Sequence, residues 1–139
     1  MIDDTLIAYC DGSGTVAHLP CGAGVVVYDD GAAILEASRA LGCGTNNHAE
    51  LSAVRVALAI TDTPELCERK ILIRTDSMYA IGSLTRPDPT PDHKPNARLI
   101  RVIRGMLRGR DWAFEHVRGR DGGRVTAATE RPSAAGERR

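Results

Sequence analysis

Three features are missing from this sequence of 139 residues, and each absence excludes a class of protein. No apolar run approaches the roughly 20 residues that a membrane-spanning helix needs, so we expect no membrane protein. The N-terminal residues lack the basic and then apolar pattern of a signal peptide, so we expect a cytoplasmic location. No pair of cysteines has C-x-x-C spacing, which argues against a zinc site.

The four cysteines are instead spread along the chain, at Cys10, Cys21, Cys43 and Cys67. Cysteines with such spacing usually serve as small buried apolar side chains. A disulfide among them remains an alternative at this point. The length corresponds to one domain that is large enough to bury a core.

The formal net charge is zero, yet the charges are unevenly distributed. Residues 1–97 hold 7 Lys and Arg against 13 Asp and Glu, a net charge of −6, whereas residues 98–139 hold 11 Arg against 5 Asp and Glu, a net charge of +6. Such segregation is a hint of a polyanionic partner. A solvated basic helix and tail would give the same pattern, so charge alone leaves both interpretations open.

The hydrophobic pattern predicts five strands, and the Asp-Gly pair at 30–31 predicts a hairpin between the second and third. Together with the three helices predicted below, the order is β-β-β-α-β-α-α-β. We therefore expect an α/β fold with a five-stranded mixed sheet, an antiparallel meander plus parallel strands, flanked by helices on both faces. The strands are expected over residues 6–10, 22–28, 32–41, 70–75 and 112–117.

A central helix is predicted between Asn47, which suits an N-cap, and the break at Asp62. A short helix is predicted over residues 78–84. An amphipathic helix follows over residues 96–107, with an apolar face inside and a basic face outside. The residues expected inside are Leu99, Val102, Ile103 and Met106, and those expected outside are Arg98, Arg101, Arg104 and Arg108.

Two aspartates follow apolar strands at equivalent places. Asp11 comes after the strand of residues 6–10 and Asp76 after the strand of residues 70–75, at the strand ends where α/β sheets collect their sites. Glu50 lies in the first turn of the central helix and faces the same rim if that helix packs on the sheet. Three converging carboxylates repel one another unless a cation holds them, and their oxygens favour Mg²⁺ or Mn²⁺.

Each of these carboxylates also has a purely structural interpretation. Asp11 begins an Asp-Gly-Ser sequence that is common in turns. Asp76, like its neighbour Ser77, suits an N-cap, and Glu50 suits the third position of a capping box that begins at Asn47.

Four segments decide between these interpretations when they are taken together. They are YCDGS at 9–13, TNNHAEL at 45–51, TDSMY at 75–79 and VRGRDG at 117–122. In this order they resemble ribonuclease H of type I, although each alone is a weak signal. The resemblance implies one ribonuclease H-like domain over residues 1–130 and a short basic tail over 131–139.

The same resemblance implies an endonuclease that hydrolyses the RNA strand of RNA–DNA hybrids and leaves 5′-phosphate and 3′-hydroxyl ends. It implies two Mg²⁺ ions at the site, with Mn²⁺ as a substitute, and a hybrid duplex as the partner of a monomer that does not bind membranes. Because phosphate contacts position a duplex without reading its bases, we expect little sequence specificity.

The family's four metal-binding carboxylates fall on Asp11, Glu50, Asp76 and Glu130. Asp11 is the ligand expected to bridge both ions. Glu130 replaces an Asp of the family, and Asp121 is the alternative fourth ligand. Arg120 replaces a loop histidine that assists catalysis in the family, and we expect it to act electrostatically because arginine does not deprotonate.

The family's substrate contacts fall on a polar set that would read the 2′-hydroxyl of RNA across the minor groove and touch the DNA strand. The set is Gly12, Ser13, Asn46, Asn47, Ser77 and Asn96. A family glutamine that touches RNA falls on Met78. A proline-rich loop over residues 85–95 replaces the basic insertion of some members, so we expect hybrid affinity to depend on the arginine face of the helix that follows.

Two other functions remain open from the sequence alone. The replaced histidine and the uncertain fourth acid are also compatible with a catalytically weak module that binds hybrids. A nuclease that acts on DNA with the same fold is the third interpretation, and the pair Asn46-Asn47 before Glu50 argues against it.

Overall fold

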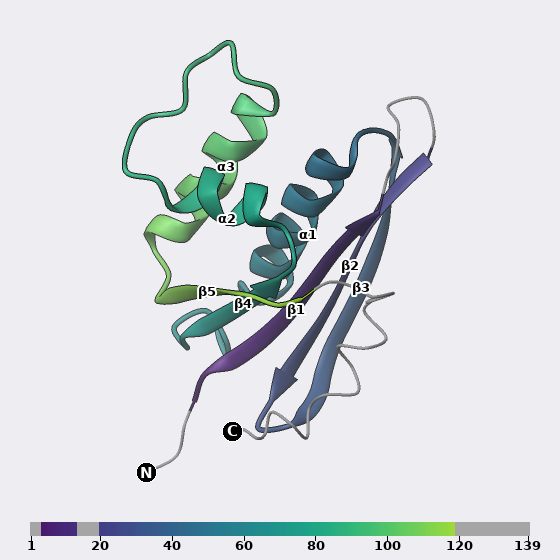
Figure 1. Ribbon diagram of the computed structural model, residues 1–139. Helices are drawn as coiled ribbons and strands as arrows, with labels where there is room; N and C mark the ends of the chain where they lie inside the picture. The colour runs from purple at the N-terminus through teal and green to yellow at the C-terminus, as the bar shows by residue number, and fades with distance from the viewer. Residues whose placement is uncertain (1–3, 14–19, 119–139) are drawn as a thin grey trace.

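The computed structural model describes residues 4–13 and 20–118, and all five predicted strands and three predicted helices are present (Figure 1). The strands are β1 (Leu6–Ser13), β2 (Pro20–Asp29), β3 (Ala32–Cys43), β4 (Ile71–Thr75) and β5 (Trp112–His116). The helices are α1 (Asn46–Ile60), α2 (Met78–Thr85) and α3 (Ala97–Arg108).

The strands form one mixed sheet in the order β3-β2-β1-β4-β5. The first three strands pair antiparallel, whereas β4 lies parallel to both β1 and β5. The predicted hairpin joins β2 to β3 through Asp30 and Gly31, whose φ angles of 54° and 84° are those that a two-residue hairpin turn needs. The mixed five-stranded sheet is therefore confirmed.

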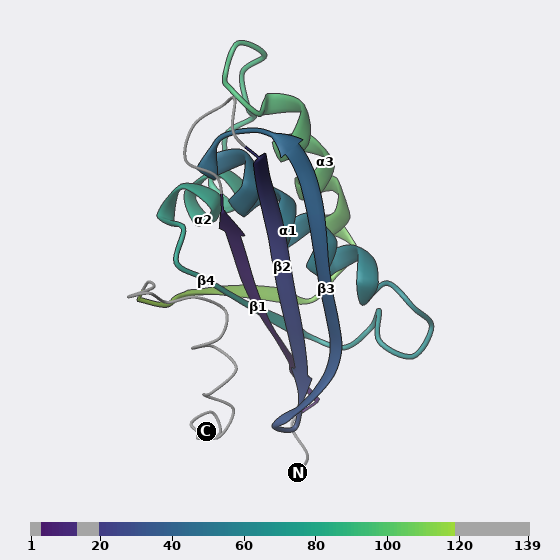
Figure 2. The ribbon, with the colours of Figure 1, turned by 90° about the vertical axis from the view of Figure 1, so that its right-hand side faces the viewer.

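All three helices lie on one face of this sheet, with α1 directly against the strands (Figures 1 and 2). The prediction of helices on both faces is thus confirmed for one face only, within residues 4–13 and 20–118. Buried apolar side chains from alternating positions of the strands meet those of α1 and α3 in a single core. None of the helices in this part of the chain is long and apolar enough to cross a membrane.

The cysteines that can be described serve the packing, as predicted. Cys10 and Cys21 are buried, Cys67 is half-buried, and all three are free thiols. The side chain of Cys43 lies outside the described set.

The opposite face of the sheet carries a smaller cluster around Tyr9, Val26 and Tyr28. The rings of Tyr9 and Tyr28 meet edge to face, with centroids 5.6 Å apart, which is a favourable aromatic geometry. Arg74 of β4 donates a hydrogen bond of 2.6 Å to the Tyr9 hydroxyl and another of 2.6 Å to Glu115 of β5. These contacts join three neighbouring strands on that face.

The inner face predicted for helix α3 is confirmed except at Val102. Ile103 is buried, and Leu99 and Met106 are half-buried and pack against the core. Val102 is 44% exposed. The rest of the buried face consists of Ala97, Ile100 and Leu107. The centre of the buried face is therefore shifted from the predicted one, because it is set by packing against α1 and α2, which the sequence does not display.

Strand β1 is three residues longer than predicted, because Asp11, Gly12 and Ser13 continue to pair with β2. The turn expected there is wrong. Gly12 serves a different purpose: a Cβ atom at this position would lie 2.2 Å from the carbonyl carbon of Ala49 and 2.4 Å from the nitrogen of Glu50. Both are backbone atoms of α1, so only glycine lets the helix approach the strand this closely.

We predict that Gly12→Ala pushes α1 away from β1 and lowers the free energy of unfolding by roughly 1–3 kcal/mol, the usual effect of overpacking. Gly82→Ala is the control, because its Cβ would lie in open space inside α2, where Ala is preferred to Gly. Urea denaturation measures both. Equal stability of the two variants would contradict the close approach described above.

Candidate metal centre

The site begins where β1 and β4 separate. Their parallel ladder runs from the pair Leu6–Ile71 to the pair Tyr9–Arg74 and stops there. Strand β1 continues along β2, whereas β4 ends at Thr75, which pairs with β5. The sheet is therefore split at this end, and side chains just beyond the last pair face a gap between two strands.

Asp11 and Asp76 flank this split at matching positions. Asp11 stands two residues after Tyr9 and Asp76 two residues after Arg74, the last pair of the ladder. The prediction that the two aspartates occupy equivalent places is confirmed, with one correction. Asp11 lies within β1, opposite Gly24 of β2, and not in a turn after it.

Glu50 reaches the same place from α1, and its predicted local role is wrong. The N-cap of α1 is Thr45, whose hydroxyl accepts a hydrogen bond of 3.2 Å from the backbone N–H of His48. Asn47 is therefore not the cap, and Glu50 is the fifth residue of the helix, beyond its first turn. Its carboxylate does not close a capping box but accepts a hydrogen bond of 3.0 Å from the backbone N–H of Gly12.

Asp76 likewise does not cap a helix. The N-cap of α2 is Ser77, whose hydroxyl accepts a hydrogen bond of 3.0 Å from the N–H of Ala80. The N–H of Ser77 in turn donates to the hydroxyl of Thr75 over 3.1 Å. These two bonds fix the backbone on both sides of Asp76, so its carboxylate is directed by a rigid strand-to-helix turn.

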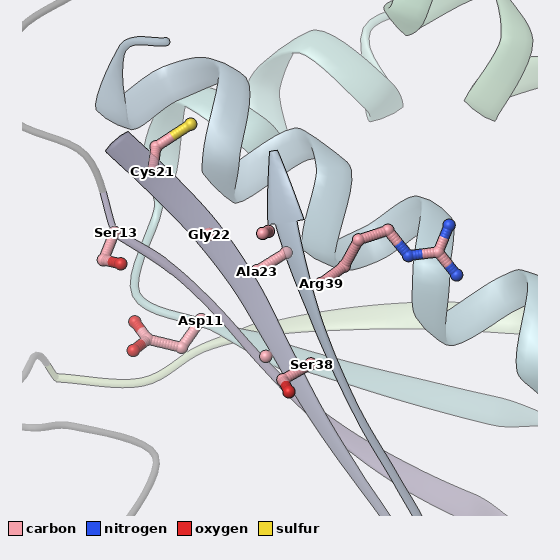
Figure 3. A pocket seen from close by; sticks show the side chains of 9 residues that line it. Asp11, Ser13, Cys21, Gly22, Ala23, Ser38 and Arg39 are labelled. Atoms are coloured by element: carbon pink, nitrogen blue, oxygen red, sulfur yellow. The ribbon is translucent and has the colours of Figure 1, made fainter. Parts of the chain in front are cut away.

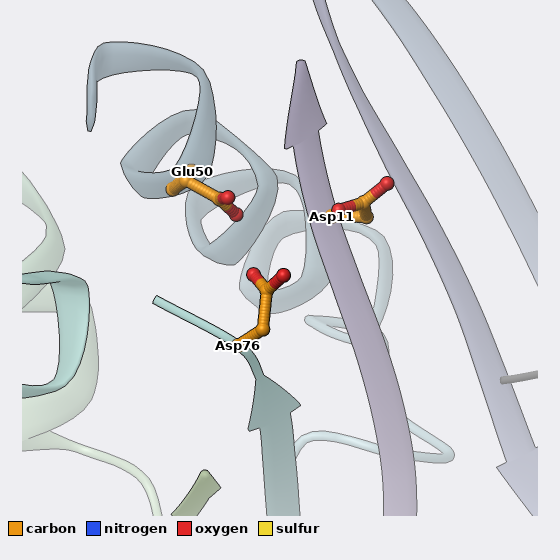
Figure 4. A group of neighbouring side chains, drawn as sticks. All are labelled: Asp11, Glu50 and Asp76. Carbon is orange, nitrogen blue, oxygen red and sulfur yellow. The ribbon is translucent and has the colours of Figure 1, made fainter. Parts of the chain in front are cut away.

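The three carboxylates converge, as Figure 4 shows. One oxygen from each of Asp11, Glu50 and Asp76 lies within 4.8 Å of the others. Three acidic oxygen donors at this spacing form the hard ligand set that Mg²⁺ and Mn²⁺ prefer. The donor chemistry therefore fits a divalent cation.

The electrostatics of the site also favour a cation. Burial, and then the neighbouring charge of Asp76, raise the pKa of Glu50 from 4.5 to about 8. The charge of Asp11 and a hydrogen bond with Asp76 act in the same direction, and the Gly12 N–H opposes them. Without a positive ion, the third negative charge is thus strongly disfavoured.

Cys10, which is buried and directly precedes Asp11 in β1, takes no part in this chemistry. Burial, followed by the charges of Glu50 and Asp11, raises the pKa of its thiol far above the usual range. A thiol that keeps its proton is neither a nucleophile nor a metal ligand.

A groove of about 440 Å³ runs from Asp11 across β2 to β3 (Figure 3). Its lining includes Gly22 and Gly24 of β2, and Ser38 and Arg39 of β3. Ser38 and Arg39 were not predicted from the sequence. Strand register is the signal that finds Ser38, because Asp11 pairs with Gly24 and Gly24 pairs with Ser38 in one row across the sheet. Arg39 pairs with Ala23 and does not belong to this row.

The residues predicted to contact substrate differ in whether their polar groups are exposed or already hydrogen-bonded. Ser13, Asn46 and Asn47 are exposed, as such contacts require: Ser13 follows Asp11 in β1, and the two asparagines begin the helix that carries Glu50. By contrast, the Gly12 N–H is bonded to Glu50 and the Ser77 hydroxyl caps α2.

Asn96 precedes α3 and donates from its side chain to the Tyr79 hydroxyl over 3.3 Å. The remaining predicted site residues, Arg120, Asp121 and Glu130, lie outside the described residues, so their roles stay predictions.

Comparison with known proteins agrees with this geometry. Residues 3–127 match the family model described as RNase H. No curated protein matches the chain.

Three solved structures share the fold. One is LC11-RNase H1, isolated from compost by a metagenomic approach (24% identity, 98% of this chain and 92% of that chain covered, TM-score 0.74). Another is LC11-RNase H1 in complex with an RNA/DNA hybrid (24%, 81% and 85%, TM-score 0.71). The third is RNase H1 from the halophilic archaeon Halobacterium salinarum NRC-1 (30%, 94% and 92%, TM-score 0.71). The chain belongs to the RNase H family.

Proposed function

We propose that this protein hydrolyses the RNA strand of RNA–DNA hybrids at the site formed by Asp11, Glu50 and Asp76. The observation that carries the proposal is the convergence of these three carboxylates, to within 4.8 Å, in a chain that belongs to the RNase H family. The complex of LC11-RNase H1 with an RNA/DNA hybrid supports the choice of substrate.

Asp11, Glu50 and Asp76 would hold the divalent cations, with Mg²⁺ as the resident ion and Mn²⁺ as a substitute. When bound, such ions activate a water molecule and stabilise charge on the phosphate. The chain contributes orientation: the Gly12 N–H holds one oxygen of Glu50, and the Ser77 cap fixes the backbone after Asp76. At neutral pH Glu50 must also release its proton when it becomes a ligand.

The RNA strand would lie along the groove beside Asp11. Gly22 and Gly24 give this groove a floor without side chains, which lets a sugar–phosphate backbone come close to the sheet. Asn46 and Asn47 stand exposed at the start of α1, next to Glu50, and supply amide groups for the 2′-hydroxyl. A monomeric state and a cytoplasmic location remain predictions from the sequence.

The test is a cleavage assay with Mg²⁺ and with Mn²⁺ on a labelled hybrid, on double-stranded RNA and on DNA. We expect metal-dependent cleavage of the hybrid only, with 5′-phosphate and 3′-hydroxyl ends. Binding of the hybrid without cleavage in either metal would contradict the enzyme and favour a binding module. Cleavage of the DNA duplex would favour a DNA nuclease.

We predict that Asp11→Asn lowers kcat on the hybrid by at least ~100-fold, because a direct ligand should matter no less than the outer contacts of a metal site. The fold should persist, because Asn is nearly the same size. Asp62→Asn is the matched control at the other end of α1 and should keep full activity. Near-normal activity of Asp11→Asn would refute the metal centre.

The raised pKa of Glu50 predicts a pH dependence of stability in the metal-free protein. Between its ordinary pKa of 4.5 and the folded value of about 8, the folded protein holds a proton that the unfolded chain has released. The free energy of unfolding contributed by this group therefore falls as the pH rises through that window. Urea unfolding in the presence of a chelator, from pH 5 to 9, measures it.

Glu50→Gln should remove this component, whereas Glu65→Gln, at an exposed glutamate, should retain it. Mg²⁺ should restore the stability of the wild-type protein most at the alkaline end. The same pH slope in wild-type protein and Glu50→Gln would show that Glu50 does not hold the extra proton.

The fourth ligand is decided by comparing Glu130→Gln with Asp121→Asn. We predict that Glu130→Gln lowers kcat and raises the Mg²⁺ concentration needed for half-maximal activity, since it removes one ionised oxygen ligand. Asp121→Asn should leave both quantities close to those of wild type. Loss of rate in the Asp121 variant alone would reverse the assignment.

A further inference from the structure

The loop between α2 and α3 holds four of the seven prolines of the chain. In residues 86–92, here called the strap, Pro87, Pro89 and Pro91 alternate with other residues. Proline donates no hydrogen bond and favours an extended conformation of the residue before it. Alternation therefore gives a segment with few backbone N–H groups, and all of its residues except Thr90 are exposed.

Two arginines of α3 donate hydrogen bonds to the strap. Arg104 donates from Nη2 to the carbonyl of Arg86, and from Nη1 to the carbonyl of Asp88 over 2.9 Å and to the Thr90 hydroxyl over 3.1 Å. Arg101 donates from Nη2 to the Thr90 carbonyl over 2.7 Å and to the Asp92 carboxylate. Thus every residue that precedes a proline of the strap, at 86, 88 and 90, has its carbonyl bonded to a guanidinium.

These bonds divide the arginine face that the sequence predicted as one unit. Arg101 and Arg104 direct donors into the strap. Arg98 and Arg108 are exposed and make no hydrogen bond or ion pair with any residue the structure describes. Arg98 lies in the first turn of α3, about 15 Å along the helix from Arg108.

The strap is connected to the metal centre through Asn96, Tyr79 and α2. It continues through Pro95 to Asn96, whose backbone takes a left-handed conformation with φ of 65° at the start of α3. The Asn96 side chain donates to the hydroxyl of Tyr79, the second residue of α2. Helix α2 itself begins directly after Asp76 and Ser77. Figure 1 shows the loop extending beyond the ends of α2 and α3 before it returns to the start of α3.

We propose that Arg101 and Arg104 are positioning residues, which hold the strap so that Asn96 is placed for contact with the DNA strand of the hybrid, and that Arg98 alone on this helix binds a phosphate. The proposal rests on the proposed function for its substrate. A guanidinium with two or three acceptors of its own chain gives up those bonds to reach a phosphate, whereas Arg98 and Arg108 give up none. Of these two, Arg98 lies two residues after Asn96, and Arg108 lies at the opposite end of α3.

The test compares the salt dependence of KM with hydrogen exchange. Arg104→Lys keeps the charge but replaces a planar fork that bonds three acceptors with a single ammonium group. We expect KM for the hybrid to rise by about threefold to tenfold at every salt concentration, as when a preorganised loop is loosened. The slope of log KM against log salt concentration and kcat should stay unchanged.

Arg98→Gln should instead reduce that slope by about one phosphate contact, and Arg108→Gln, the matched control, should reduce nothing. In the absence of nucleic acid, the Lys94 amide, which donates to the Pro91 carbonyl over 3.1 Å, should exchange faster in Arg104→Lys and in Arg101→Lys than in wild type. The proposal is overturned if Arg104→Lys changes neither exchange nor KM, or if Arg104→Gln reduces the salt slope as Arg98→Gln does.

Failure of the underlying function gives a different result. If the wild-type protein neither cleaves nor binds the hybrid, the proposed function is wrong and the placement of Asn96 for DNA is wrong with it. Hydrogen exchange still reports separately whether the two arginines hold the strap. Faster exchange in both lysine variants supports that part, and unchanged exchange overturns it.

Discussion

The hydrogen bond from the Gly12 N–H to the Glu50 carboxylate is the contact on which the site depends. It requires α1 to lie in contact with β1. This contact requires glycine at position 12, because any Cβ atom there would overlap the helix backbone. The same approach buries Glu50 to 3% exposure between helix and sheet. One backbone donor thus fixes the position of an acid that has almost no contact with water.

This arrangement fixes the position of Glu50 but disfavours its negative charge. A buried carboxylate beside Asp11 and Asp76 is disfavoured in its ionised form, and a single N–H compensates for only part of that. The split between β1 and β4 keeps the aspartates apart along the sheet, but it cannot remove their repulsion of Glu50. The fold therefore holds three ligands ready at close range, and a divalent cation gains free energy by relieving the repulsion.

The sequence predicted the parts of this site that depend on local pattern and on family motifs, and it missed those that depend on tertiary approach. Apolar runs placed Asp11 and Asp76 at equivalent points of two strands, and the pairing confirms it. The capping-box role of Glu50 and the turn after Asp11 were wrongly predicted for one reason: Gly12 and Glu50, 38 residues apart, bond to each other and not to their sequence neighbours. Local propensity cannot reveal a partner that far along the chain.

The arginines of α3 show the same limit for charge. A helical wheel groups the four arginines of α3 into one phosphate-binding face. It shows where the charged side chains lie but not which hydrogen-bond acceptors are packed beside them. The acceptors come from the loop before the helix, where the carbonyls of residues 86, 88 and 90, each followed by a proline, accept hydrogen bonds from Arg101 and Arg104. A backbone carbonyl competes with a phosphate for the same N–H groups, and it is always present at short range. The charge that such a helix offers to nucleic acid is thus set by the segment packed beside it as well as by its own sequence.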